Sequence, residues 1–264
     1  MNPSAIEDVV RMLRDKVSVE IVSTPDLLRQ AYQLRYQVYC VERGFLAGQN
    51  GIECDEYDAF ARHAVVRWRQ TNAVVGTVRL VLPKIPPEEH DFPIQRICDD
   101  VLLRRFPRAT RGEVSRFALT KELPKQVQGV SSAFSLLRLA LIQGAIRLSA
   151  EAGHTHWLAV MEPTLLRLLR VTGLHFEPLG PLVEHHGLRQ PAVAELVPTL
   201  TRLAIERPVV WSFVTSDGKW YSESRPGFVS LRAARAAKMM GQRLRLGSNG
   251  GAGTGAPKGM DRLP

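Results

Sequence analysis

The sequence has few cysteines and no long apolar run. Its 264 residues include three cysteines, Cys40, Cys54 and Cys98, which are too few for a disulfide framework and lack the spacing of metal ligands. The longest apolar runs are short and interrupted by Arg or Glu, so none approaches the roughly 20 residues of a membrane-spanning helix. The N-terminal segment also lacks the apolar core of a secretion signal. We therefore expect a reduced, cytoplasmic protein.

Recognisable nucleophile motifs and complete metal-ligand sets are also missing. There is no Gly-x-Ser-x-Gly sequence of the kind that presents a catalytic serine. His154 and His156 would share one face of a strand, and His185 and His186 lie near a turn. A zinc site needs three or four converging ligands, and neither histidine pair has an evident third partner. We interpret all four as ordinary core or surface residues and expect no metal.

Positive charge is plentiful but unevenly spread. The formal net charge is +9, and the segment from Arg225 to Pro264 contributes eight bases against one acid. We expect a body over residues 1–224, a basic helix over 225–246 and a disordered Gly-rich tail over 247–264. The basic helix could lie on an anionic membrane surface at the inner face, attract an acidic acyl carrier protein, or be merely solvated. Phe228 is its one aromatic residue, so we expect no nucleic-acid partner.

Periodicity and turn residues predict alternating strands and helices. Helices are expected over residues 25–44, 95–105, 131–152 and 163–173. Strands are expected over residues 17–23, 61–70, 72–83, 112–120, 155–161, 175–180, 181–187, 189–196 and 209–215. An antiparallel start followed by strand–helix–strand units indicates an α/β fold of the mixed, α+β kind, with a twisted mixed sheet and helices on both faces.

Charged residues concentrate beside apolar strand residues in four short segments. Arg35 and Tyr39 lie four residues apart on a predicted helix, and the pair Asp55 and Asp58 follows in a loop. Arg79 lies on one predicted strand, and Glu113 and Arg116 lie together on the next predicted strand. Each segment alone could be a surface salt bridge. An unpaired charge inside an apolar strand costs several kcal/mol, however, so we expect these complementary charges to meet in one cluster.

The same segments carry a family resemblance. The sequences RYQVYCVERGF, ECDEYD, GTVRLVLP and EVSRFAL, in this order, resemble the autoinducer (acyl-homoserine lactone) synthases. They are also similar to the N-acyl amino acid synthases and to the acyltransferases associated with PEP-CTERM/exosortase systems. All of these are GNAT-superfamily N-acyltransferases. The resemblance therefore implies a GNAT-like fold that transfers an acyl group from a thioester to an amine.

The resemblance also implies site residues and partners. Glu113, Arg116 and Arg79 would be catalytic, and the substrate-binding residues would be Arg35, Tyr39, Asp55, Asp58 and Phe117. The donor would be a long-chain acyl group on acyl carrier protein or coenzyme A, and the acceptor a small amine such as an amino acid. No tightly bound cofactor is implied.

Two alternatives to an N-acyl amino acid synthase remain open. One is an autoinducer synthase that uses S-adenosylmethionine; against it, Tyr39 stands where those enzymes usually have Phe, and only Phe45 approaches the position of their Trp. The other is a non-catalytic module that binds an acyl chain or a membrane.

Glu113 and Arg116 pose a geometric problem. Side chains alternate along a strand, so these two would point to opposite faces of the sheet. We therefore predict a β-bulge between them if both serve one site. Burial beside Phe117 would raise the pKa of Glu113, whereas Arg116 would lower it, and the sequence does not decide between these effects.

A loop before the longest predicted helix offers a phosphate site. Residues 126–131 resemble the pyrophosphate-binding loop of GNAT enzymes at Gln126 and Gly129, whereas the last place has Ser131 instead of glycine or alanine; free N–H groups at a helix start bind phosphate. We expect the phosphopantetheine arm of the donor to bind there, although an ordinary helix-capping loop has the same sequence features.

Overall fold

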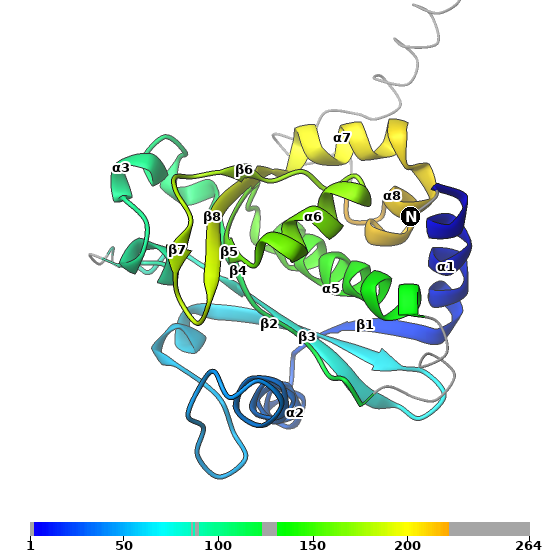
Figure 1. The fold of residues 1–264 in the computed structure, drawn as a ribbon, viewed down its shortest axis with the longest axis horizontal. Coiled ribbons are helices and arrows are strands. Elements are labelled where there is room, and N and C mark those ends of the chain that lie inside the picture. The colour runs from blue at the N-terminus through cyan, green and yellow to red at the C-terminus, as the bar shows by residue number, and fades with distance from the viewer. Residues whose placement is uncertain (1–2, 86, 88–89, 123–130, 222–264) are drawn as a thin grey trace, which may run out of the picture. The chain divides into compact units, whose positions relative to one another are not determined.

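The computed structural model describes residues 3–85, 87, 90–122 and 131–221 (Figure 1). The predicted basic helix over 225–246 and the predicted tail over 247–264 lie outside the described residues, as do Gln126 and Gly129.

Helices and strands alternate along most of the described chain. The first half contains α1 (Pro3–Lys16), β1 (Val17–Ile21), α2 (Pro25–Arg35), the π-helix η1 (Tyr36–Glu42), the 3-10 helix η2 (Glu56–Phe60), β2 (Ala61–Trp68), β3 (Ala73–Val81), η3 (Pro93–Arg96), α3 (Asp100–Leu103), η4 (Arg108–Thr110) and β4 (Arg111–Leu119). The second half contains α5 (Ser131–Ala152), β5 (His156–Met161), α6 (Pro163–Val171), β6 (Glu177–Pro178), β7 (Val183–Glu184), β8 (Leu188–Glu195), α7 (Leu196–Glu206) and α8 (Pro208–Val214).

One mixed sheet organises these elements. Its strands follow the order β1-β2-β3-β4-β5-β8-β6, and β7 pairs with β8. Neighbouring strands are antiparallel except β4 and β5, which run parallel. The predicted mixed sheet is confirmed, because a strand–helix–strand unit returns β5 beside β4 in the same direction.

Helices cover both faces of the sheet, as predicted (Figure 1). On one face α2 packs Leu27 and Ala31 against Val65 of β2. On the other face α5 lies so close to the sheet that a Cβ atom on Gly144 would come within 2.9 Å of the Ala64 side chain. Glycine at this position allows the helix and the sheet to approach.

The parallel pair β4 and β5 separates partway along its length. Arg111 of β4 pairs with His156 of β5, and the pairing ends at Glu113 and Leu158. Beyond these residues β4 runs on to Leu119 and β5 to Met161 without pairing to each other. The two strands therefore leave a gap between them that begins at Glu113.

Strand β4 contains a bulge, as predicted, but the bulge begins at Arg116 instead of lying between Glu113 and Arg116. Thr77 of β3 lies opposite Ala118, and Arg79 lies opposite Ser115, so β4 has one residue more than β3 across this stretch. Arg116 adopts a φ of 48°, a left-handed conformation that is uncommon for residues other than glycine. The extra residue changes the alternation of side chains, so Glu113 and Arg116 can serve the same site.

One predicted strand is wrong. Residues 209–215 were expected to be extended, but Pro208–Val214 form α8, whose buried side chains are Val210, Phe213 and Val214. This spacing is the i, i+3, i+4 pattern of a helix face, and Pro208 occupies the first turn, where proline is tolerated. A seven-residue apolar run does not distinguish a strand from a buried helix by pattern alone.

Candidate functional site

Three arginines and three carboxylates form a buried ion cluster beneath α2. The members of this inner cluster are Arg35, Glu53, Asp55, Asp58, Arg79 and Arg116. Arg35 donates from Nε to Glu53 Oε2 at 2.5 Å and from Nη1 to Asp58 Oδ1 at 2.7 Å. Equal numbers of the two charges, joined by hydrogen bonds, offset much of the cost of removing them from water.

Arg79 joins three segments within the inner cluster. Its side chain is fully buried, and Nη1 donates to Asp55 Oδ1 at 2.5 Å and to Asp58 Oδ1 at 2.9 Å. Its Nε donates to Ser115 Oγ on β4 at 3.0 Å. Arg79 therefore holds β3, η2 and β4 together.

Arg116 lies at the accessible edge of the inner cluster. Its Nη2 donates to Glu53 Oε1 at 2.9 Å and to Asp55 Oδ2 at 2.8 Å, and its guanidinium lies 5.8 Å from the centre of the Tyr39 ring. The structure gives Nη1 no partner in the described part of the chain. These bonds hold the residue in its left-handed conformation and leave one nitrogen for a ligand.

The spacing of Asp55 and Asp58 follows from a helix start. Asp55 Oδ1 accepts from the Tyr57 N–H at 2.9 Å, and the Asp55 N–H donates to Asp58 Oδ2 at 2.8 Å. This reciprocal capping begins η2 and fixes both carboxylates. The other carboxylate oxygens remain available to the arginines.

The arginines set the ionisation of the inner cluster. Burial alone raises the pKa of Glu53, but hydrogen bonds from Arg35 and Arg116 outweigh burial and hold that pKa below its ordinary value. The same balance lowers the pKa of Asp55, where Arg79 supplies the main hydrogen bond. Both carboxylates therefore stay ionised at neutral pH.

Glu113 has the opposite environment. It is 2% exposed, and Oε2 accepts the Ile94 N–H at 2.8 Å. That N–H belongs to the first turn of η3, where backbone donors lack a partner within the helix. Burial raises the pKa of Glu113 to about 7 and prevails over the opposing influence of Arg79 and Arg116. The effect that the sequence left undecided is thus resolved in favour of burial.

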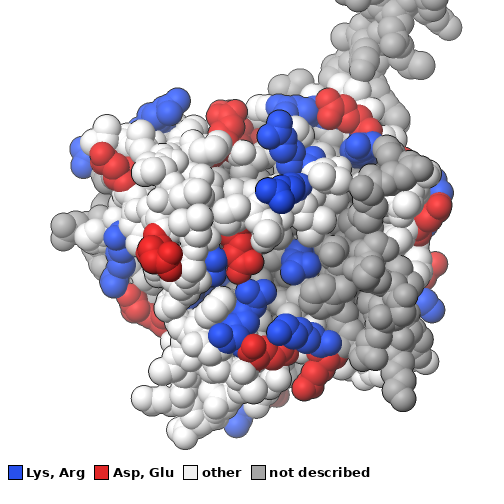
Figure 2. Space-filling view, in the orientation of Figure 1, with Lys and Arg blue, Asp and Glu red and all other residues white. Residues whose placement is uncertain are grey.

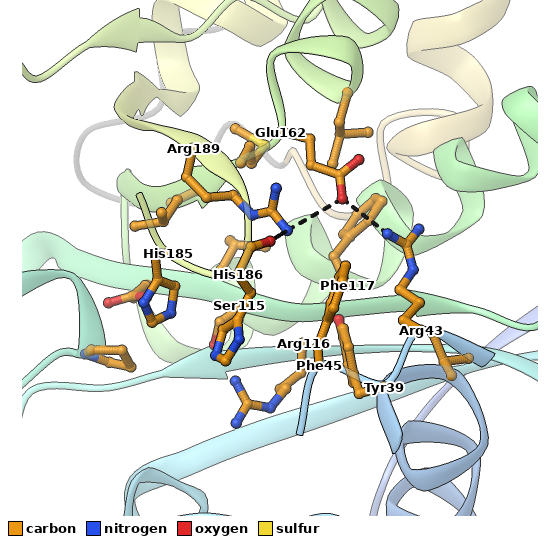
Figure 3. Close-up of a pocket in the computed structure, with 18 of the residues that line it drawn as sticks. Tyr39, Arg43, Phe45, Ser115, Arg116, Phe117, Glu162, His185, His186 and Arg189 are labelled. Atoms are coloured by element: carbon orange, nitrogen blue, oxygen red, sulfur yellow. Dashed lines mark hydrogen bonds and ion pairs between the residues drawn. The ribbon is translucent and has the colours of Figure 1, made fainter. Parts of the chain in front are cut away.

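A pocket of about 630 Å³ occupies the gap between β4 and β5 (Figure 3). Five of the predicted site residues line it: Tyr39, Asp55, Glu113, Arg116 and Phe117. Its volume lies within the range usual for ligand sites in proteins.

The other predicted residues lie elsewhere. Arg35, Asp58 and Arg79 do not line the pocket and belong to the buried part of the inner cluster. Ser131 begins α5, but its side chain is outside what the structure describes, as are Gln126 and Gly129.

Apolar side chains form much of the pocket wall. They come from α5, β5, α6 and the segment after it: Ile142, Ala159, Met161, Leu165, Leu168, Leu169 and Phe176. Such a wall suits a hydrocarbon chain, which gains free energy when it leaves water.

Sequence reasoning missed two groups of residues. Glu53 lies inside the quoted ECDEYD segment, and its place next to Cys54 and Asp55 was the only signal. The second group lines the pocket mouth and comprises Arg43, Phe45, Glu162, His186 and Arg189. These residues come from three distant segments, and no local pattern links them. On the face that Figure 2 shows, basic side chains gather near the centre with acidic ones among them.

The described residues contain no cluster of His, Cys, Asp and Glu that could hold a metal ion. Within the same residues, no helix is long and apolar enough to cross a membrane.

A family comparison identifies the class of domain. Residues 34–127 match the family model described as an acetyltransferase (GNAT) domain. The match includes the end of α2, the inner cluster and all of β4. This part of the chain is thus similar to GNAT acetyltransferase domains, as the resemblance of the motifs implied. A comparison with curated proteins found no match.

Solved structures share the fold. The acyl-homoserine lactone synthase LasI is 20% identical, with a TM-score of 0.53 over 69% of this chain and 93% of LasI. The CoA-dependent acyl-homoserine lactone synthase BjaI, solved with SAM and isopentyl-CoA, is 18% identical, with a TM-score of 0.56 over 81% of this chain and 92% of BjaI. FeeM, an N-acyl amino acid synthase from uncultured soil microbes, is 16% identical, with a TM-score of 0.51 over 72% of this chain and 96% of FeeM. The predicted GNAT-like fold is confirmed.

Proposed function

We propose that the protein is an N-acyltransferase that moves a long-chain acyl group from a thioester to the amine of an amino acid or a related metabolite. One observation carries the proposal. Glu113, a buried carboxyl with a pKa of about 7, lies where two strands separate around a largely apolar pocket. A group with such a pKa can accept a proton at neutral pH and release it again.

The donor occupies the gap between the strands in this proposal. The acyl chain lies against the apolar wall formed by residues such as Leu165, Leu168 and Phe176. Edges of β4 and β5 that do not pair with each other offer backbone groups to the amides of a pantetheine arm. Both acyl carrier protein and coenzyme A present this arm, and BjaI was solved with a CoA thioester.

The acceptor lies over the accessible edge of the inner cluster. Asp55 stays ionised and attracts the amine, while the Nη1 atom of Arg116 is available to a carboxylate. Arg35, Asp58 and Arg79 serve as positioning residues, because they hold Asp55 and Arg116 without lining the pocket.

The chemistry requires one proton acceptor. The neutral amine attacks the thioester carbonyl carbon, a carbon–nitrogen bond forms, and the carbon–sulfur bond breaks. Glu113 takes the proton from nitrogen, directly or through water, and the proton then passes to the thiolate to give the free thiol. A backbone N–H of β4 beyond Glu113 stabilises the oxyanion formed on the way.

Mass spectrometry tests this proposal. The purified protein is mixed with long-chain acyl carrier protein or acyl-CoA and a pool of amino acids plus S-adenosylmethionine. We expect a new N-acyl product that the Glu113→Gln variant forms at least 100-fold more slowly, in line with the loss of a general base. Glu56→Gln is the matched control, since Glu56 is exposed and does not line the pocket. An intact thioester across the whole pool, with folded protein, would refute the proposal.

S-adenosylmethionine is the second candidate acceptor. The likeness to LasI and to BjaI, which was solved with SAM, favours it. In that case the product in the same experiment is an acyl-homoserine lactone, which has a distinct mass.

A further inference from the structure

Two arginines at the pocket mouth share one carboxylate oxygen. Arg43 Nη1 lies 2.9 Å from Glu162 Oε1, and Arg189 Nη2 lies 3.4 Å from the same atom (Figure 3). Arg43 follows η1, Glu162 precedes α6, and Arg189 belongs to β8. Three separate parts of the chain thus bring two positive charges to a single negative one.

An aromatic ring lies between these two guanidiniums. The Arg43 and Arg189 guanidinium carbons are 5.5 Å and 5.7 Å from the centre of the Phe45 ring. His186 stacks on the same ring, with 6.0 Å between ring centres. We call Arg43, Phe45, Glu162, His186 and Arg189 the cationic wall. The ring face orients both cations without neutralising either.

The cationic wall has more positive than negative charge. It contains two arginines and one carboxylate, and Arg138 of α5 also lines the pocket nearby. Burial, and after it the Arg43 guanidinium, lower the pKa of Arg138 against the opposing influence of Glu162. The inner cluster, by contrast, has three charges of each sign. An excess of cations in a partly apolar pocket favours an anionic ligand.

The cationic wall and the acceptor site are continuous. Arg116, His185 and the five residues of the cationic wall all line the same pocket. In the view of Figure 3 the His186 ring appears between the Arg189 and Arg116 side chains. An amino acid that reaches Arg116 with its α-carboxylate can therefore reach the cationic wall with its side chain.

We propose that the cationic wall binds a side-chain carboxylate of the acceptor, so that the substrate class is the acidic amino acids. This inference rests on the proposed function. It also disfavours S-adenosylmethionine, because the positively charged sulfonium would face Arg43 and Arg189.

Isosteric amino acids test the inference. Glutamate and glutamine, and aspartate and asparagine, differ in side-chain charge but hardly in shape. With the donor held constant, we expect kcat/KM for glutamate to exceed that for glutamine at least tenfold. Equal use of the two, or a preference for S-adenosylmethionine, would overturn the inference and leave the proposed acyl transfer intact.

Variants of the cationic wall should change the ratio of kcat/KM for glutamate to kcat/KM for glutamine in opposite directions. Arg189→Gln removes a cation and should bring the ratio within threefold of one, whereas Glu162→Gln removes the competing carboxylate and should increase it. Arg43→Gln, at a half-exposed residue, replaces Arg189→Gln if that variant does not fold. The matched control is Arg170→Gln on the exposed face of α6, which should leave the ratio unchanged.

A binding measurement separates the two proposals. Calorimetric titration of the Glu113→Gln variant with glutamate and with glutamine requires no turnover. Tighter binding of glutamate, weakened by Arg189→Gln, would support the inference even if no transfer were detected. Equal or undetectable binding of both amino acids would overturn it.

Discussion

Glu53 and Glu113 are buried to nearly the same extent, 4% and 2% exposed, yet their pKa values move in opposite directions. Glu53 accepts from Arg35 and Arg116, and its pKa lies below the ordinary value. Glu113 accepts one backbone N–H from Ile94, and its pKa rises to about 7. Burial raises both pKa values and acts more strongly on the deeper Glu113, whereas the arginine hydrogen bonds that lower the pKa of Glu53 are missing at Glu113.

The comparison separates a structural role from a chemical one. A carboxylate fixed by two guanidiniums holds its charge and can stabilise the fold only while its partners remain. A carboxyl with no ion-pair partner, at the edge of a pocket, changes its charge near neutral pH. Neighbouring titratable groups with pKa values shifted in opposite directions are typical of sites that carry out acid–base chemistry.

The largest expected difference between the two glutamates is in activity. Glu113→Gln should lower kcat for acyl transfer by about 10²–10⁴-fold, because the base is lost while the amide can still accept the Ile94 N–H. Steady-state kinetics with the free thiol as readout would measure this. An unchanged kcat would show that another group accepts the proton.

Stability should respond most strongly to Glu53. Glu53→Gln removes one carboxylate partner from each of Arg35 and Arg116, which keep only Asp58 and Asp55 respectively, and should lower the free energy of unfolding by about 3–5 kcal/mol. Denaturant titration monitored by circular dichroism gives this value. The double variant Glu53→Gln, Arg116→Gln should lose less than the sum of the single variants, and strict additivity would contradict the ion-pair assignment.

The pH dependence of stability should isolate Glu113. Because the pKa of Glu113 is raised in the folded state, its contribution to the free energy of unfolding is complete below the ordinary pKa of 4.5. This contribution is lost as the pH rises through the folded-state value of about 7. Relative to Glu113→Gln, the wild-type protein should therefore lose up to about 3 kcal/mol between pH 4.5 and 8. Parallel stability curves for the two proteins over this range would rule out the raised pKa.

The smallest effect is expected for Arg116→Lys. Lysine keeps the charge but replaces two donating nitrogens with one, so we expect a loss of about 1–2 kcal/mol. The same denaturant titration measures it. A loss as large as that of Glu53→Gln would mean that the guanidinium geometry, rather than its charge, stabilises the inner cluster.

The sequence was sufficient for five of the six residues of the inner cluster, all but Glu53, and for a bulge in β4. Arg35, Asp55, Asp58, Arg79 and Arg116 each lie in a short motif on a predictable element, and buried charges must find partners. The bulge followed from side-chain alternation between Glu113 and Arg116. Both arguments use local rules that do not depend on distant packing.

The pocket mouth could not be predicted in the same way. Arg43, Glu162 and Arg189 are separated by long stretches of chain, and their meeting depends on how β5, β8 and the end of η1 are placed. The helix Pro208–Val214 was missed for a related reason, since its packing against α5 rather than its apolar run determines its conformation.

The extra residue in β4 also makes the strand sensitive to deletion. Removing one residue between Ser115 and Ala118 would restore an even ladder with β3 and abolish the bulge in which Arg116 lies. Ala118 would still lie opposite Thr77, so the side chains beyond the cut would keep their faces, whereas removing two residues would turn them to the opposite face. When this chain is aligned with other proteins of this fold, a one-residue deletion here therefore indicates that the backbone of the site differs. A substitution indicates that only a side chain differs.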